Sequence, residues 1–135
     1  MSTRTAIRAA EFRSALRSFL RASEEISRAS GLTPPQRHLL LLMIKGAPDG
    51  SERATIGQLV DRLELAQSTV TELAQRAEEA GLVSRESSDS DGRVVYLRLT
   101  VEGERRLARV FKAHANERRR LRAMVIDLEV DPAPS

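Results

Sequence analysis

The sequence contains no cysteine and no tryptophan, and its aromatic residues are limited to one tyrosine and three phenylalanines. The absence of cysteine excludes disulfide bonds, thiolate metal sites and thiol-based redox sensing within this chain. The chain has two histidines, His38 and His114, and neither is flanked by carboxylates at a spacing that favours metal binding. We therefore expect neither a metal ion nor any other cofactor.

Long apolar runs are missing as well. No stretch approaches the roughly 20 apolar residues that a membrane-spanning helix needs, and residues 1–14 lack the apolar segment of a secretory signal. A glycine-rich phosphate loop, a nucleophile paired with a base and a convincing pair of catalytic carboxylates are also absent from the sequence. These absences favour a cytoplasmic protein that has no contact with a membrane and is not an enzyme.

Length and charge narrow the possibilities further. The 135 residues suffice for one domain with a hydrophobic core. The net charge of +3 and the pI near 10.1 favour a nucleic-acid partner. Residues 67–100 nevertheless hold four arginines against six carboxylates, a net charge of −2, and the arginine excess lies towards both ends of the chain. We therefore expect a few well-placed arginines, rather than a broad basic patch, to contact phosphates.

Two short helical patterns follow each other before residue 81. The first has apolar residues at three- and four-residue spacing. Thr55 with Gln58 forms a capping-box signature, which predicts that this helix begins at Ile56. Residues 63–66 then leave room only for a tight turn. Two short helices joined by such a turn make a helix-turn-helix motif.

The second of these helices, expected over about residues 66–80, has an apolar and a polar face, and Gly81 stands where it ends. In helix-turn-helix proteins the N-terminal end of this helix points side chains at base edges in the major groove. Glutamine can bind adenine through two hydrogen bonds, and serine or threonine can contact any base. Ordinary exposure of polar residues to solvent is the alternative. The inward residues are expected to be Val70, Leu73, Ala74 and Ala77, and the DNA-contacting residues Gln67, Ser68, Thr69, Thr71, Gln75 and Arg76.

A β-hairpin is expected after the second helix. Residues 82–85 and 94–100 have strand patterns, and the polar loop between them ends in a turn-forming Asp-Gly pair. A helix-turn-helix followed by a hairpin is a winged helix. Arg93, near the tip of this wing, is placed to enter the minor groove, where a narrow A·T-rich groove has a strongly negative potential.

Two further residues of the wing loop are candidates for the DNA-binding surface. Ser90 offers a hydroxyl to the phosphate backbone. Asp91 carries the same charge as a phosphate, so we expect it to hold an arginine in position rather than to contact DNA. Arg93 and Arg76 are both candidates for the arginine that Asp91 orients.

Residues 81–103 resemble the wing of the MarR family of transcriptional regulators. That family's pattern is G-L-V-x-R, a polar loop, D-x-R, a short strand and then L-T-x-x-G. Residues 32–36 resemble its L-T-x-x-Q helix start, and residues 67–71 resemble the start of its recognition helix. The matching wing positions are Gly81, Leu82, Val83, Arg85, Asp91, Arg93, Leu99, Thr100 and Gly103.

The patterns that flank the winged helix are helical. Residues 5–31 and 101–128 each form one long amphipathic pattern, and the second has a heptad-like seam. We read them as dimerisation helices. His114 and Arg118 lie on that seam, where they either pair across an interface or splay to its edge. A row of arginines in the first helix, best explained as a solvated face, consists of Arg13, Arg17 and Arg21.

Another helix is expected to begin with Thr33 as its N-cap. Residues 39–44 are apolar on every side, so this helix is predicted to be buried all round. His38, at its start, is interpreted as a hydrogen-bonded histidine of the interior or of an interface, in preference to a ligand contact. Residues 47–53 are expected to form a loop.

The predicted fold class is therefore mainly α (α+β), one domain of residues 1–135 with a winged helix-turn-helix over residues 33–100. The resemblance implies a homodimer that binds a pseudo-palindromic operator in double-stranded DNA, most often as a repressor. It also implies a pocket, between the DNA-binding and dimerisation halves, for a small aromatic or phenolic effector. Ala66 at the recognition-helix N-cap and Glu64 in the turn depart from the family pattern. A regulator of the ArsR or PadR type and a protein-interaction adapter that has lost DNA binding remain alternatives.

Overall fold

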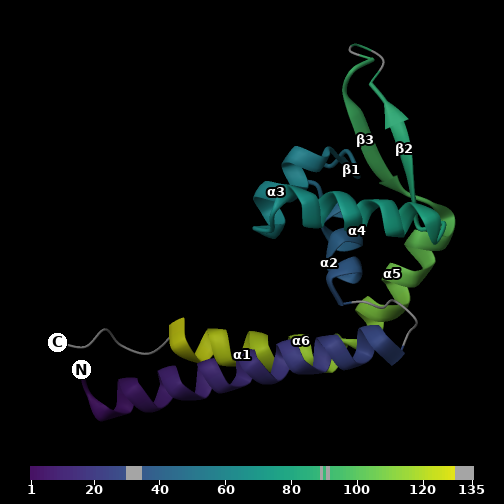
Figure 1. The fold of residues 1–135 in the computed structure, drawn as a ribbon. Coiled ribbons are helices and arrows are strands. Elements are labelled where there is room, and N and C mark those ends of the chain that lie inside the picture. The colour runs from purple at the N-terminus through teal and green to yellow at the C-terminus, as the bar shows by residue number, and fades with distance from the viewer. Residues whose placement is uncertain (30–34, 89, 91, 130–135) are drawn as a thin grey trace.

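The structure is a computed structural model that describes residues 1–29, 35–88, 90 and 92–129, with side chains up to residue 125. Two long helices, α1 and α6, pack side by side in one layer, and the remaining elements stand above one end of it (Figure 1). The elements are α1 (Thr3–Ala29), α2 (Pro35–Lys45), β1 (Arg53–Ala54), α3 (Ile56–Leu63), α4 (Gln67–Glu79), β2 (Val83–Ser87), β3 (Val95–Leu99), α5 (Val101–Ala113) and α6 (Ala115–Glu129).

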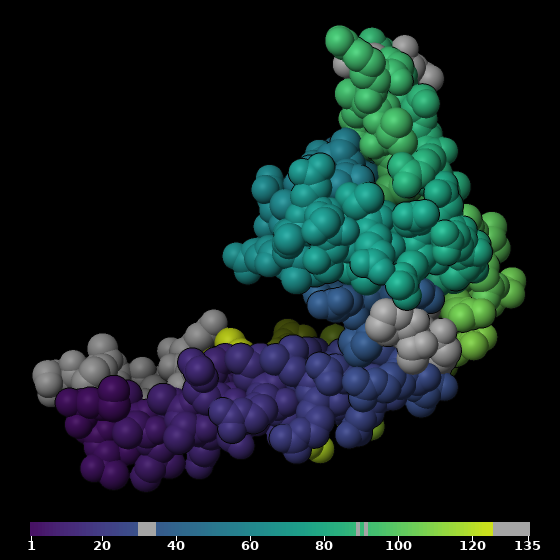
Figure 2. Space-filling view, viewed as in Figure 1, coloured from purple at the N-terminus to yellow at the C-terminus, as the bar shows by residue number. Residues whose placement is uncertain are grey.

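We call residues 35–113 the winged-helix half, and α1 with α6 the long-helix layer. A hairpin of β2 and β3 projects from the winged-helix half as a free arm, well away from the long-helix layer (Figure 2). Helices with a small antiparallel sheet make up the chain, which confirms the predicted fold class. None of the helices in the described ranges has the length and hydropathy that crossing a membrane requires.

The helix-turn-helix begins with the predicted capping box. Thr55 Oγ1 accepts a hydrogen bond from the Gln58 backbone N–H at 3.1 Å, and the Gln58 side chain accepts one from the Thr55 N–H at 2.9 Å. The turn after α3 is tight because Glu64 adopts the left-handed conformation, with φ of 54°. That conformation is unfavourable for a residue with a side chain, which explains why a glycine is common at this point.

The end of α4 is tied to the start of α5. Gly81 has φ of +75°, and the Leu82 N–H donates to the Ala77 carbonyl at 2.9 Å, which closes the helix in a Schellman motif. Thr100 Oγ1 donates to the Gly81 carbonyl at 2.6 Å and accepts from the Gly103 N–H at 3.1 Å. Thr100 thus caps α5 and anchors it to the turn that precedes the wing.

The sheet has the order β1-β3-β2, with both pairs of neighbouring strands antiparallel. The hairpin strands occur where the sequence predicts them. Strand β1 was missed, because the sequence analysis assigned residues 47–53 to a loop. Its two residues, Arg53 and Ala54, pair with Arg98 and Leu97 of β3. So short a strand has no alternation to detect, and it forms because β3 offers a free edge to the chain entering α3.

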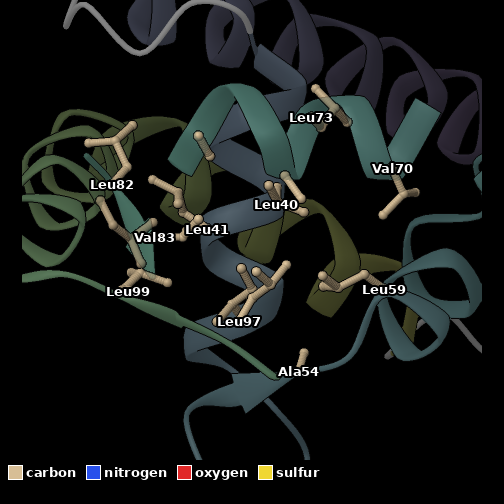
Figure 3. Packing of buried hydrophobic residues seen from close by; sticks show 14 of the residues in the cluster. Leu40, Leu41, Ala54, Leu59, Val70, Leu73, Leu82, Val83, Leu97 and Leu99 are labelled. Atoms are coloured by element: carbon tan, nitrogen blue, oxygen red, sulfur yellow. The ribbon is translucent and has the colours of Figure 1, made fainter. Parts of the chain in front are cut away.

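The hydrophobic core lies around α2, between α4 on one side and the sheet on the other (Figure 3). The residues predicted to face inward from α4 are all buried. Helix α2 is not buried all round as predicted, since Leu39 is 37% exposed, whereas Leu40, Leu41 and Ile44 are fully buried. An apolar run on every side of a helix therefore does not mean burial on every side here. Leu39 faces the gap towards the long-helix layer, where it lines a cavity.

The C-terminal pattern was predicted as one helix over residues 101–128, and this is wrong. The chain bends at His114, so that α5 belongs to the winged-helix half while α6 lies along α1 (Figure 1). The heptad-like spacing continued across the bend and concealed it. Arg118 secures the bend, because its guanidinium lies 3.5 Å from the Phe111 ring centroid and donates to the Phe111 carbonyl. The predicted cap at Thr33 and the helix end at Gly31 lie outside the described residues.

Candidate nucleic-acid interface

The outer face of α4 is polar and exposed, as predicted. It presents two rows of exposed side chains at four-residue spacing. Thr69 is the exception among the predicted contacts, since it is half-buried at the edge of this face. The first row is Gln67, Thr71 and Gln75; the second is Ser68, Glu72 and Arg76, in which the Arg76 Nη2 lies 2.8 Å from Glu72 Oε1.

The N-terminus of α4 has no side-chain cap. Ala66 occupies the N-cap with an extended backbone, φ −62° and ψ 147°, and its side chain cannot accept a hydrogen bond from the first turn. The first N–H groups of a helix have no partner within the helix, and they carry the positive end of its dipole. The exposed start of α4 therefore suits an anion such as a phosphate.

The wing carries Arg93 in an exposed position close to its tip. The loop is closed by a hydrogen bond from the Ser88 N–H to the Val94 carbonyl at 3.0 Å. Ser90 is also exposed, and its hydroxyl lies 3.0 Å from the Ser88 hydroxyl. Asp91 lies outside the described residues, so its role as an orienting residue stays a prediction. Arg76, one of the two arginines considered for it, is paired with Glu72 on its own helix.

Several acidic residues within residues 67–100, the segment with a net charge of −2, form ion pairs with arginines of the protein. Glu72 pairs with Arg76, and Glu78 Oε1 lies 3.1 Å from the Arg85 Nε of β2. Glu86 pairs with Arg98. These three arginines are already counted in the net charge of −2, so the ion pairs leave that charge unchanged, and only Arg53, which lies outside residues 67–100, adds a positive charge beside Glu86.

The outward face of the sheet holds a group of residues that the sequence analysis did not single out. Glu86 of β2 contacts Arg98 of β3 at 2.9 Å and Arg53 of β1 at 3.3 Å. The Arg53 guanidinium also lies over the Tyr96 ring, 4.0 Å from its centroid. The hydrogen bond from Arg98 is the main reason that the pKa of Glu86 lies below its ordinary value. Because β1 was not predicted, no pattern in the sequence indicated that Arg53 would join this group.

Arg37, at the start of α2, is another residue that the sequence analysis missed. With Gln75 and Arg76 it lines a shallow hollow of about 570 Å³ beside α4. Its Nε is buried and has no hydrogen-bond partner in the described part of the chain. Burial, and then the positive charges of Arg76 and Arg106, lower the pKa of Arg37. The hollow is also lined by Glu72 and Glu79, so two arginines and two carboxylates meet beside the C-terminal half of α4.

A cavity of about 340 Å³ lies where α2 meets the long-helix layer and the bend between α5 and α6. His38 and His114 are both buried beside it, with ring centroids 5.6 Å apart. Burial, followed by the neighbouring His114, lowers the pKa of His38 from 6.5 to about 4. The walls are mostly apolar, and they include Phe19, Leu20, Leu39, Leu42, Phe111 and Arg118.

Both histidines are buried, and each differs in part from its predicted role. His38 is buried, as expected, but its Nδ1 has no hydrogen-bond partner among the described residues. His114 does not stand on a surface seam. It is buried within its own chain, where its Nε2 lies 3.3 Å from the Ser23 carbonyl. In the ranges that the structure describes, no three His, Cys, Asp or Glu side chains gather closely enough to hold a metal ion.

A helix-turn-helix with an exposed polar second helix, followed by a projecting hairpin, defines a winged helix-turn-helix protein. A sequence model of the MarR family matches residues 30–94. No match was found among curated protein sequences.

Solved structures of MarR-family proteins share the fold. A MarR family protein from Bacillus stearothermophilus is 28% identical, covers 98% of this chain and 86% of its own, and superposes with a TM-score of 0.69. Sco3205, a MarR family transcriptional regulator from Streptomyces coelicolor solved in complex with DNA, is 21% identical over 90% of this chain and 74% of its own, with a TM-score of 0.68. A mutant MarR from E. coli complexed with operator DNA is 18% identical over 84% of this chain and 78% of its own, with a TM-score of 0.66.

The sequence match and the shared fold agree with the resemblance carried by the wing. The chain is similar to the MarR family of transcriptional regulators in the sequence of residues 30–94 and in fold. Members of this family regulate transcription and are not enzymes, which confirms the prediction that this chain is not an enzyme. An ArsR-type or PadR-type regulator is thereby set aside.

Proposed function

We propose that this protein is a sequence-specific DNA-binding transcriptional regulator that acts in the cytoplasm as a homodimeric repressor. In this proposal α4 enters the major groove of a pseudo-palindromic operator, and the wing places Arg93 in the flanking minor groove. The observation that carries the proposal is the pairing of an exposed polar face on α4 with a projecting arm that bears an exposed arginine. Two related structures of the same fold were solved with DNA.

The residues of α4 take different roles in this proposal. Gln67 and Thr71, at the start of the exposed face, read base edges, with glutamine suited to adenine. Ser68 and the uncapped N–H groups after Ala66 contact phosphate. Gln75 reaches the edge of the groove. Arg76, together with Arg37 in the adjacent hollow, contacts the phosphate backbone.

Dimerisation through the long-helix layer is supported by exposed apolar side chains. Ile7 and Leu20 of α1 are 53% and 55% exposed, and Val125 of α6 is also exposed. Large apolar side chains gathered on one layer mark a surface that another protein covers. Two copies joined there would carry two α4 helices to successive turns of the same DNA face, which accounts for a pseudo-palindromic site.

The cavity between the halves is the proposed effector site. Its apolar walls suit an aromatic ring, and Arg118 offers a cation to an acidic or phenolic group. Because α2, α1 and the α5–α6 bend all line it, a bound molecule would change how the winged-helix half sits on the long-helix layer. That change would alter the spacing of the two α4 helices and release the operator.

A protein-interaction adapter is the second candidate, and the net charge of −2 over residues 67–100 is the observation that favours it. An adapter of this kind would show no salt-dependent binding to DNA. Arg53, which lies outside that segment and contacts Glu86, offsets one unit of this negative charge and so weakens the alternative.

The test is to select duplexes from a randomised pool with the full chain and to measure their binding by fluorescence anisotropy over a series of salt concentrations. We expect a palindromic sequence and a steep dependence on salt. Arg93→Ala should weaken binding by about tenfold and reduce the salt slope by about one. Arg13→Ala, in the exposed row of α1, is the matched control and should change neither.

Three outcomes would decide against the proposal: no enriched duplex, binding that ignores salt, or equal affinity of Arg93→Ala and the wild type. Repression is tested separately by placing the selected duplex in a reporter promoter, where the wild type should lower expression and Arg93→Ala should not. Sedimentation of the free protein and of its complex reports the dimer. Addition of simple aromatic acids to the preformed complex tests the effector site.

A further inference from the structure

Glu86 joins the three strands of the sheet through a single carboxylate. Its Oε1 lies 3.3 Å from Arg53 Nη1 on β1, and its Oε2 lies 2.9 Å from Arg98 Nε on β3. The Arg53 guanidinium reaches this position by crossing the ring of Tyr96, 4.0 Å from the ring centroid. We call Arg53, Glu86, Tyr96 and Arg98 the wing clamp.

The wing clamp connects the hairpin of β2 and β3 to the helix-turn-helix. Strand β1 leads directly into Thr55, which caps α3, so Arg53 stands at the entry to the DNA-reading helices. Glu86 lies further out, opposite Tyr96 and one pair from the end of the strand ladder at Ser87 and Val95. A contact between these two points restrains the angle at which the wing leaves the winged-helix half.

Removal of the carboxylate would also leave a repulsion in the sheet. Arg53 and Arg98 are directly opposed in the β1–β3 ladder, and like charges opposite each other destabilise a pair of strands. The side chains of Arg98 and Glu86 are 41% and 40% exposed. Solvent screens an ion pair that is this exposed, so the pair contributes little to global stability. We expect the pair to affect the angle at which the hairpin projects rather than the stability of the core.

We infer that Glu86 is a positioning residue for DNA binding, which sets the wing at the angle that lets α4 and the wing tip engage adjacent grooves together. This inference rests on the proposed DNA-binding function and deepens it, since Glu86 would act through the position of the wing rather than through a contact of its own with DNA. A two-groove contact depends on the distance between the two reading elements. A hairpin attached only at its base would bend freely and lose binding energy in being ordered.

Electrostatic repulsion alone predicts the opposite change in DNA affinity when Glu86 loses its charge. Glu86 lies on the arm that approaches a polyanion, so removal of its charge should strengthen binding if the residue merely repels phosphate. If it positions the wing, removal of its charge should weaken binding. The direction of the change therefore separates the two roles.

The experiment uses the full chain and the duplex selected by the wild type. Glu86→Gln should bind about three to ten times more weakly, the range expected for loss of an exposed charge pair that restrains one contact. Glu102→Gln is the matched control, because Glu102 also bridges two arginines with a similarly exposed side chain but stands on α5, outside the hairpin. The control should bind as the wild type does.

Two further readouts distinguish positioning from a general loss of structure. Hydroxyl-radical footprinting of the Glu86→Gln complex should lose protection in the flanking minor groove and keep the protection centred on α4. In the Arg93→Ala background, Glu86→Gln should weaken binding no further, because the contact that it positions is already gone. Thermal unfolding of Glu86→Gln should resemble that of the wild type.

The inference is overturned if Glu86→Gln binds as tightly as the wild type or more tightly. It is also overturned if its loss adds in full to that of Arg93→Ala, or if protection is lost in both grooves together. Failure of the wild type to select any duplex would instead remove the proposed function, and the inference with it. The wild-type selection therefore tests the proposed function, and the comparison of variants tests the role of Glu86 separately.

Discussion

Gly103 is the residue at which one added methyl group should cost most. It lies in the first turn of α5, where a Cβ would stand 2.0 Å from the Leu82 carbonyl oxygen and 3.0 Å from its carbon. The obstructing atoms belong to the backbone, so no side-chain rotation can relieve the contact. The same Leu82 oxygen accepts a hydrogen bond from the Thr100 N–H at 3.0 Å. This close approach explains why the L-T-x-x-G pattern ends in glycine.

The cost of Gly103→Ala can be worked out from this geometry. Carbon and oxygen must separate by about 1 Å or more, and overpacking of this kind destabilises by about 1–3 kcal/mol. Weakening of the hydrogen bond from Thr100 adds about 1 kcal/mol. The better helix propensity of alanine returns about 1 kcal/mol. We expect a net loss of roughly 1–3 kcal/mol in the free energy of unfolding, or roughly 3–10 °C in Tm for a domain of this size.

Urea unfolding followed by circular dichroism, at one fixed protein concentration, measures this loss. Gly57→Ala is the matched control, because Gly57 also lies in the first turn of a helix, yet the nearest atom to its Cβ is Thr55 Oγ1 at 3.9 Å. That variant should be more stable than the wild type by about 0.5 kcal/mol. If Gly103→Ala proves as stable as Gly57→Ala, the close packing of α5 against Leu82 is wrong.

Two other predictions concern the recognition helix and the buried histidines. Ala66→Ser should raise the free energy of unfolding by about 1 kcal/mol, because it supplies the missing N-cap of α4; an unchanged urea midpoint would contradict this. His38 has a folded pKa of about 4, below its unfolded value near 6.5, so the unfolded chain binds more protons between these limits. Stability from this group is therefore fully present above pH 6.5 and falls as the pH drops towards 4, by up to about 3 kcal/mol. His38→Gln should flatten the stability profile in this window, and an equally steep profile in both proteins would refute the assignment.

The local features of the winged helix could be predicted because each has a cause within a few residues. The capping box at Thr55 and Gln58 and the glycine that ends α4 act over one turn. The alternation of buried residues in β3 has the strand period of two. The inward residues of α4 follow from the helical period in the same way.

What the sequence did not reveal depends on contacts between distant segments. Strand β1 exists because β3 offers it an edge more than 40 positions further along the chain. The bend at His114 interrupts an apolar spacing that itself runs on without a break. The closeness of His38 and His114, and the bridge from Glu86 to Arg53, each require the tertiary fold. Spacing within one helix or strand carries no information about such pairs.

The core described above closes within the winged-helix half. Among the described residues, every buried apolar side chain of the core lies between Leu40 and Val110, and α1 adds only the partly buried Ile26 at its margin. The winged-helix half can therefore fold around its own core whichever helices replace α1 and α6. In a dimer held by α1 and α6, these two helices alone would set the separation of the two half-sites, and they form a frame that can be exchanged for another. Hybrid proteins that keep residues 35–113 and replace that frame would then change operator spacing while keeping base preference.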